Sequence, residues 1–118
     1  MIKIAVDAMG GDNAPGEIVK GAVDAVTERK DITVCLTGQK DVIEKELSKY
    51  TYKIEQIEIV DAPEVIETGE PPVNAIRKKK NSSLVVGLNL VKNGEADGFV
   101  SAGSSGAVLV GGQVIVGR

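Results

Sequence analysis

IKIAVDAMGGDNAPGEIVKGAVDAV, residues 2–26, predicts a strand, a glycine-containing loop and a helix in that order. Residues 2–6 are mostly apolar and β-branched, which is typical of a buried strand. The helix is expected from about residue 15 to residue 29, with Asn13 as its N-cap. Its apolar residues recur at the spacing of one helix face: Val19, Ala22, Val23 and Val26.

The rest of the chain repeats this alternation of strands and helices. Further strands are expected at residues 32–36, 57–60 and 98–101, and further helices at residues 40–49, 73–80, 82–92 and 105–117. Such alternation implies parallel strands joined by right-handed crossovers. We therefore expect an α/β fold with a parallel sheet. A helical bundle is the weaker alternative, because three of the apolar runs are too short and too β-branched for it.

The last expected helix, residues 105–117, is apolar on nearly all sides. A helix without a polar face must be buried. Two explanations remain open at this point: the polypeptide continues and covers this helix, or a partner chain does.

The composition argues against several classes of protein. The formal net charge of -3 does not suit a nucleic-acid-binding protein, which needs a basic surface. Histidine is absent, and no Cys, Asp or Glu residues have metal-ligand spacing, so we expect neither a metal nor a cofactor. The single cysteine, Cys35, lies in an apolar run, and we see neither a signal peptide nor a membrane span. We therefore expect a cytoplasmic protein.

Two loops follow strands at the sheet edge where parallel α/β proteins bind ligands. The first is DAMGGDNAPG, residues 7–16, whose adjacent glycines let the backbone approach a ligand closely. The start of the next helix favours an anion there. The alternative is a plain strand-to-helix turn that Asp12 or Asn13 caps. Asp7 either positions a hydroxyl or an amine, or bonds only to turn amides.

The second loop is SAGSSGA, residues 101–107. Two glycines flank two hydroxyl groups, so backbone amides and hydroxyls can converge on one anion. The alternative is an N-cap formed by Ser104 or Ser105, with small residues for close packing. The loop lacks the lysine of a Walker sequence, which disfavours a nucleoside triphosphatase.

A basic run, Arg77 to Lys80, lies between the two loops in the sequence. Arg77 can grip a phosphate or carboxylate as a fork, and Lys79 can add a point charge. The alternatives are a solvated face or a contact with an acidic carrier protein. Ser82 and Ser83 are expected to cap the next helix.

Three blocks of sequence resemble one family. They are IAVDAMGGDNAPGEIVKGA (4–22), EPPVNAIRKKKNSS (70–83) and VKNGEADGFVSAGSSGA (91–107). Together and in this order they resemble the N-terminal portion of the PlsX family, the phosphate:acyl-[acyl-carrier-protein] acyltransferases. That family usually has SAGNTGA in the third block, so Ser104 replaces an amide and Ser105 keeps a hydroxyl.

This resemblance implies that residues 1–118 are the N-terminal α/β portion of a longer acyltransferase domain. The implied fold is similar to that of isopropylmalate dehydrogenase and phosphotransacetylase. The implied reaction moves a fatty acyl group from acyl-acyl-carrier-protein to inorganic phosphate, and the acyl phosphate feeds bacterial phospholipid synthesis. A homodimer is implied as well, in the cytoplasm or in peripheral contact with the membrane.

The absence of histidine is compatible with this chemistry. Phosphate is already an anionic nucleophile, and a thiol with a pKa of about 8.5 leaves readily. Two rival functions are a phosphotransacetylase-like enzyme that uses acyl-coenzyme A, and a non-catalytic module that only binds an anion or dimerises.

The candidate site depends on the two loops meeting around one anion. Two groups of residues are expected to form it. The catalytic candidates are Asp7, Arg77, Lys79, Ser104 and Ser105, and the phosphate- or substrate-binding candidates are Gly10, Gly11, Asp12, Asn13, Ser82, Ser101, Gly103 and Gly106.

Overall fold

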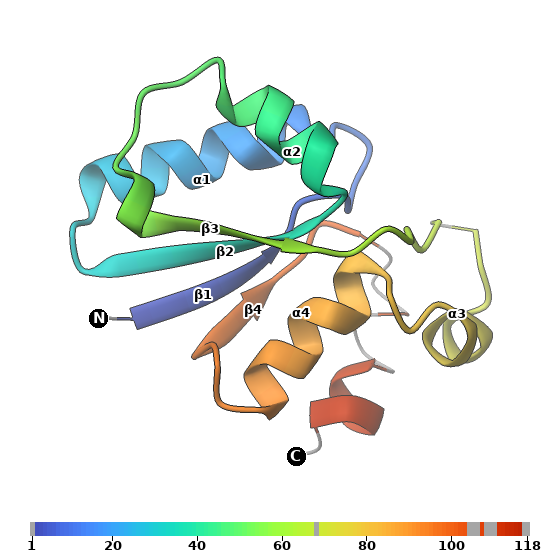
Figure 1. Cartoon of the computed structure of the whole chain (residues 1–118). Helices are drawn as coiled ribbons and strands as arrows, with labels where there is room; N and C mark the ends of the chain where they lie inside the picture. Colours follow the sequence, from blue (N-terminus) through green and yellow to red (C-terminus); the bar gives the residue numbers. More distant parts are fainter. Residues whose placement is uncertain (1, 68, 104–106, 108–110, 117–118) are drawn as a thin grey trace.

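The computed structural model describes residues 2–67, 69–103, 107 and 111–116 of the chain. Strands and helices alternate along most of this length (Figure 1). In chain order the elements are β1 (Ile2–Asp7), α1 (Gly16–Glu28), β2 (Ile32–Gly38), α2 (Lys40–Leu47), the 3-10 turn η1 (Ile54–Gln56), β3 (Ile57–Asp61), α3 (Pro72–Lys78), α4 (Ser83–Lys92), β4 (Gly98–Val100) and the π-helical turn η2 (Gly112–Val116).

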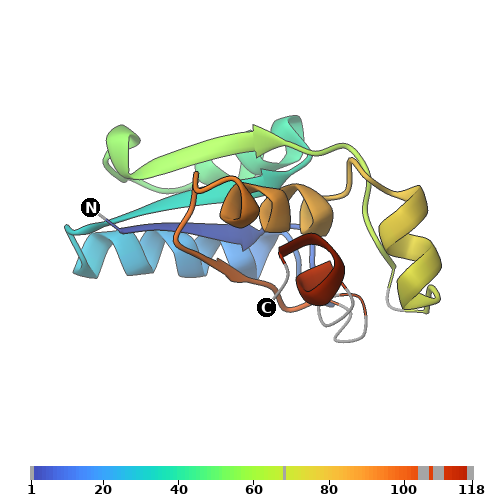
Figure 2. The same cartoon turned by 90° about the horizontal axis from the view of Figure 1, so that it is seen from below.

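The strands form one four-stranded sheet in the order β3-β2-β1-β4. Every pair is parallel, and Ile4 of β1 lies between Val34 of β2 and Gly98 of β4. Helices α1 and α2 lie over one face of the sheet and α4 over the other (Figures 1 and 2). From β1, the chain adds β2 and β3 on one side and then places β4 on the other side. Sheets of this kind bind ligands at the carboxyl ends of the two strands where the order changes side, here β1 and β4. The prediction of an α/β fold with a parallel sheet is confirmed.

Each face of the sheet has its own apolar core. Under α1 and α2 the core includes Val26, Leu36 and Ile43, all essentially inaccessible to solvent. On the other face, α4 approaches the sheet closely because position 87 is a glycine. A Cβ there would lie only 2.4 Å from Cε1 of Phe99. Burial of one such aliphatic or aromatic side chain contributes about 1.5–3 kcal/mol to the stability of the fold. The two apolar layers therefore hold in place the strands that carry the loops.

The N-cap prediction for α1 is wrong. The helix begins at Gly16, and no side chain caps it. The backbone carbonyl of Asn13 instead accepts a hydrogen bond from the amide of Glu17 at 3.1 Å. The Asn13 carbonyl thus already accepts from an amide in the first turn of α1, and the side chains of Asp12 and Asn13 are not needed as caps.

Most of the helix expected over residues 105–117 lies outside the described residues. The described part contains the turn η2, whose Ile115 packs against the apolar core beneath α4. Gly111 is buried there too, and a Cβ on it would lie 2.6 Å from Cδ1 of Leu88. At least part of this apolar segment is thus buried by α4 of the same chain.

Candidate functional site

The loops that follow β1 and β4 are in direct contact. Since the two strands are parallel neighbours, both loops leave the sheet at the same edge. A Cβ on Gly10 would lie 2.9 Å from the backbone nitrogen of Gly103, so only a glycine permits this approach. Gly11, with a φ of +93°, lies against Ala102 in the same way. The predicted meeting of the two loops is confirmed as far as Gly103.

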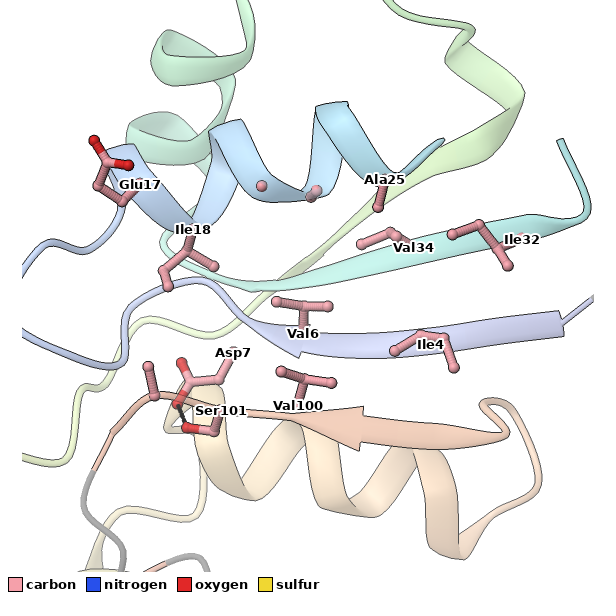
Figure 3. A pocket seen from close by; sticks show the side chains of 13 residues that line it. Ile4, Val6, Asp7, Glu17, Ile18, Ala25, Ile32, Val34, Val100 and Ser101 are labelled. Atoms are coloured by element: carbon pink, nitrogen blue, oxygen red, sulfur yellow. Dashed lines mark hydrogen bonds between the residues drawn. The ribbon is translucent and has the colours of Figure 1, made fainter. Parts of the chain in front are cut away.

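A buried carboxylate joins the two loops (Figure 3). Oδ2 of Asp7 accepts a hydrogen bond from the Ser101 hydroxyl at 2.9 Å. Its Oδ1 accepts one from the Met9 amide at 3.0 Å, and the Ser101 oxygen accepts one from the Gly103 amide at 3.0 Å. Asp7 is only 3% exposed. Asp7 and Ser101 are therefore each other's hydrogen-bond partners, and together they connect the two loops.

The remaining loop candidates occupy different surroundings. Asp12 and Asn13 are exposed on the outer part of the first loop. Ser104, Ser105 and Gly106 lie outside the described residues.

The basic run is organised differently from the prediction. Nζ of Lys79 donates to the backbone carbonyl of Val65 at 2.7 Å and also to the carboxylate of Glu70. The hydrogen bond from Lys79 lowers the pKa of Glu70 below its usual value of 4.5. The lysine charge is therefore already balanced by a carboxylate.

Arg77 is an exposed residue of α3, and among the described residues it forms no ion pair. Within the same described residues, no hydrogen bond joins Arg77 or Lys79 to either loop. These two cations therefore lie outside the network of the two loops. The loop candidates that the structure does bring together are Asp7, Gly10, Gly11, Ser101 and Gly103.

The start of α4 is buried at the same sheet edge. The hydroxyl of Ser82 accepts a hydrogen bond from the Val85 amide at 3.2 Å, which confirms its predicted role as the helix cap. Ser83 is the first helical residue, so its predicted capping role is wrong. Ser82 is fully buried, and its hydroxyl oxygen is engaged in the cap.

Sequence reasoning missed Thr37, at the carboxyl end of β2. Its hydroxyl donates to the backbone carbonyl of Ser83 at 2.7 Å, and Thr37 is fully buried. The rule that ligands bind beyond the carboxyl ends of parallel strands was the signal that could have drawn attention to it.

An apolar cavity of about 440 Å³ lies beside the loop contact, on the α1 side of the sheet (Figure 3). Asp7, Ser101 and Ala102 line one part of it. The side chains that line the rest are largely aliphatic and include Ile4, Val6, Ile18, Ala25, Val34 and Val100.

Within the part of the chain that the structure describes, no group of three His, Cys, Asp or Glu side chains is arranged to hold a metal ion. Among the same residues, no helix has both the length and the apolar character needed to cross a membrane.

Comparisons with known proteins agree with one another. A family model described as "Fatty acid synthesis protein" matches residues 2–118. A "Phosphate acyltransferase" of Clostridium botulinum is 55% identical over 117 residues, which cover 99% of this chain and 35% of that protein. Proteins of the same name from Clostridium tetani and Clostridium kluyveri are 53% and 56% identical, over 99% and 98% of this chain and 35% and 34% of theirs. This chain thus spans about a third of the length of the curated relatives it matches.

Proposed function

Because the chain belongs to the family of fatty acid synthesis proteins, we propose that it is the N-terminal α/β portion of a phosphate acyltransferase. The proposed reaction moves a fatty acyl group from acyl-acyl-carrier-protein to inorganic phosphate. The acyl phosphate product is used in bacterial phospholipid synthesis. The observation that carries the proposal is the contact between the two glycine loops, where Gly10 packs onto Gly103.

The proposed chemistry uses the loops to position phosphate. A phosphate oxygen attacks the thioester carbonyl carbon, the carbon–sulfur bond breaks, and the carrier's thiol group leaves as a thiolate. The nucleophile is already charged and the leaving group is a good one, so the protein contributes mainly orientation and charge stabilisation. Backbone amides near the loop contact supply the donors, together with those of residues 104–106 and the hydroxyls of Ser104 and Ser105.

The roles of the other candidates follow from their contacts. Asp7 and Ser101 hold the loops together and do not bind phosphate in this proposal, since a buried carboxylate repels an anion and both groups are already paired. The positive charge falls to Arg77 in preference to Lys79, because Lys79 is paired with Glu70. Binding of phosphate by Arg77 would require a domain arrangement that brings α3 toward the loops.

We propose further that the enzyme acts in the cytoplasm as a homodimer. Its partners are acyl carrier protein and inorganic phosphate, with a peripheral contact to the membrane. Nucleic acid is not among its partners, in keeping with the net charge of -3.

A donor comparison tests the proposal. The full-length Clostridium botulinum relative is assayed for acyl phosphate with acyl-acyl-carrier-protein and with acyl-coenzyme A, and so is this chain. We expect the relative to prefer the carrier-linked donor and this chain alone to be inactive. Preference for acyl-coenzyme A would favour a phosphotransacetylase-like enzyme. If neither donor gives acyl phosphate, the proposal fails.

A substitution connects the assay to the loops. Gly10→Ala at the matching position of the relative should lower kcat/KM for phosphate by at least about tenfold, since misplaced loops lose the orientation of the nucleophile. An unchanged kcat/KM would remove the loop contact from the phosphate site.

A further inference from the structure

We infer that an α-helix packs into the apolar cavity between α1 and β4 in the longer relatives, and that the part of those proteins that this chain does not span supplies it. This inference rests on the family relationship and on the exposed sheet face, and it does not depend on the acyl-transfer proposal. We call the site the α1–β4 groove; it is lined by Ile4, Val6, Ile18, Gly21, Ala25 and Val100.

One face of the sheet is covered by helices at β2 and open at β4. Leu36, Val6 and Val100 lie opposite one another in β2, β1 and β4, so their side chains point to the same face. Leu36 is 0% exposed beneath the helices, Val6 is half-buried, and Val100 is 56% exposed. Parallel sheets occur almost only with helices on both faces. Exposure therefore increases along this row from β2 to β4, and β4 is the strand that one more helix would cover.

The opposite face shows that β4 belongs to the interior of a layered fold. Helix α4 packs on that face, and Phe99 of β4 lies against Gly87. β4 is thus covered on one side and open on the other. A helix beside α1 would complete the second layer.

Helix α1 presents small residues to the groove. The two helical residues Gly21 and Ala25, one turn apart, line the groove. A Cβ on Gly21 would meet nothing within 4 Å, so this side of α1 leaves space. Helices pack with their axes about 8–10 Å apart, and small side chains permit the shorter distances. The surface suits a neighbouring helix.

The character of the lining specifies the chemistry of that helix. Apart from Asp7 and Glu17, the residues around the groove carry no charge. Glu17 is exposed in the first turn of α1. The covering helix should therefore present an apolar face and place a lysine or arginine near Glu17. The relatives have ample length to supply it, since this chain covers only 35% of the Clostridium botulinum protein.

A helix explains the groove better than an acyl chain does. A substrate tail would be present only during turnover and would leave Val100 exposed in the resting protein. A parallel sheet needs its cover in the resting state as well.

Cysteine reactivity tests the inference. Ala25→Cys places a thiol in the groove, and Asp24→Cys is the matched control on the exposed side of the same helix. Both variants are made in this chain and at the matching positions of the full-length Clostridium botulinum relative, and their rates of alkylation by a maleimide are measured without substrate. Cys35 is 3% exposed, so its background in this chain should be low.

We expect both thiols to react in this chain. In the full-length relative the thiol at position 25 should react at least tenfold more slowly than the control at position 24. A benzophenone group attached at position 25 should cross-link to a peptide outside the region that this chain matches. Equal reactivity at the two positions in the relative would overturn the inference.

Two other occupants give different outcomes, and each would also overturn it. Protection in this chain that grows with protein concentration would assign the groove to a second copy. Protection that requires an acyl donor would assign it to the acyl chain. If Ala25→Cys does not fold in the relative, Gly21→Cys gives the same test from one turn earlier on the same lining. None of these readouts measures turnover, so a failed acyl-transfer proposal would leave the result interpretable.

Discussion

In the loop contact and in the basic run, a carboxylate accepts a hydrogen bond from a side chain, but the two pairs differ in burial and in the distance along the sequence between the partners. Asp7 and Ser101 are 94 residues apart in sequence, and Asp7 is 3% exposed. Glu70 and Lys79 are nine residues apart, and the Glu70 side chain is 26% exposed. Solvent still reaches the partly buried Lys79–Glu70 pair and screens it, whereas water cannot replace the donors of a buried carboxylate. The loop contact therefore joins distant parts of the fold, and the Lys79–Glu70 pair is a local contact.

Asp7→Ala should give the largest effect. The substitution leaves the Ser101 hydroxyl and the Met9 amide without their acceptor. We expect the free energy of unfolding to fall by about 3 kcal/mol, as is typical when buried donors lose their partners. Urea denaturation of this chain measures it. The control is Asp12→Ala in the exposed part of the same loop, which should stay within about 0.5 kcal/mol of the wild type. Equal losses for the two variants would break the distinction between buried and exposed loop residues.

Gly10→Ala should be next. The added methyl group would lie 2.9 Å from the backbone nitrogen of Gly103, so the two loops must separate. Such overpacking should lower the free energy of unfolding by about 2 kcal/mol. Gly69→Ala is the matched control, because a Cβ there meets nothing within 4 Å. A thermal melt that ranks the two variants equally would show that the loops are not closely packed.

Arg77→Ala tests a cation that forms no ion pair with the other described residues. At the matching position of the full-length relative we expect KM for phosphate to rise about tenfold, which corresponds to the loss of one hydrogen bond to a charged group. Lys78→Ala, on the same helix, should leave KM within a factor of about two. If Lys79→Ala has the larger effect, Lys79 must leave Glu70 to reach the substrate.

Glu70→Gln should have the smallest effect, and that effect should depend on pH. The hydrogen bond from Lys79 holds the pKa of Glu70 below its usual 4.5 in the folded protein. The ion pair therefore stabilises the fold above that pH, and the contribution is lost as the pH falls through the lowered pKa. We expect a slightly lower Tm for the variant at pH 7 and no difference in strong acid. A difference in Tm that persists in strong acid would show that the role of Glu70 is not electrostatic.

The sequence predicted much of the fold because its patterns are local. The apolar run of residues 2–6 and the helix spacing after it identify β1 and α1 without tertiary information. The meeting of the two loops was predictable for a different reason, since parallel strands bring their carboxyl ends to one edge.

The details of the site depended on long-range pairing. Asp7 bonds to Ser101 only because β4 lies beside β1, and no local pattern encodes that strand order. The Lys79–Glu70 pair was missed because it depends on how the segment between β3 and α3 folds back onto α3, and no local pattern specifies that course. The N-cap of α1 was misassigned because a backbone carbonyl, that of Asn13, did what a side chain was expected to do.

The hydroxyl of Thr37 has one more consequence. It donates to the Ser83 carbonyl at 2.7 Å and lies 3.4 Å from the carbonyl of Val6, so one side chain touches β2, β1 and the start of α4. Fraying of β2 at this end would break the link to the first turn of α4. Regions that can open only together exchange their amide hydrogens as one cooperative unit. The amides around Thr37 and those of the first turn of α4 should therefore share a single opening free energy, although 46 residues of chain separate Thr37 from Ser83.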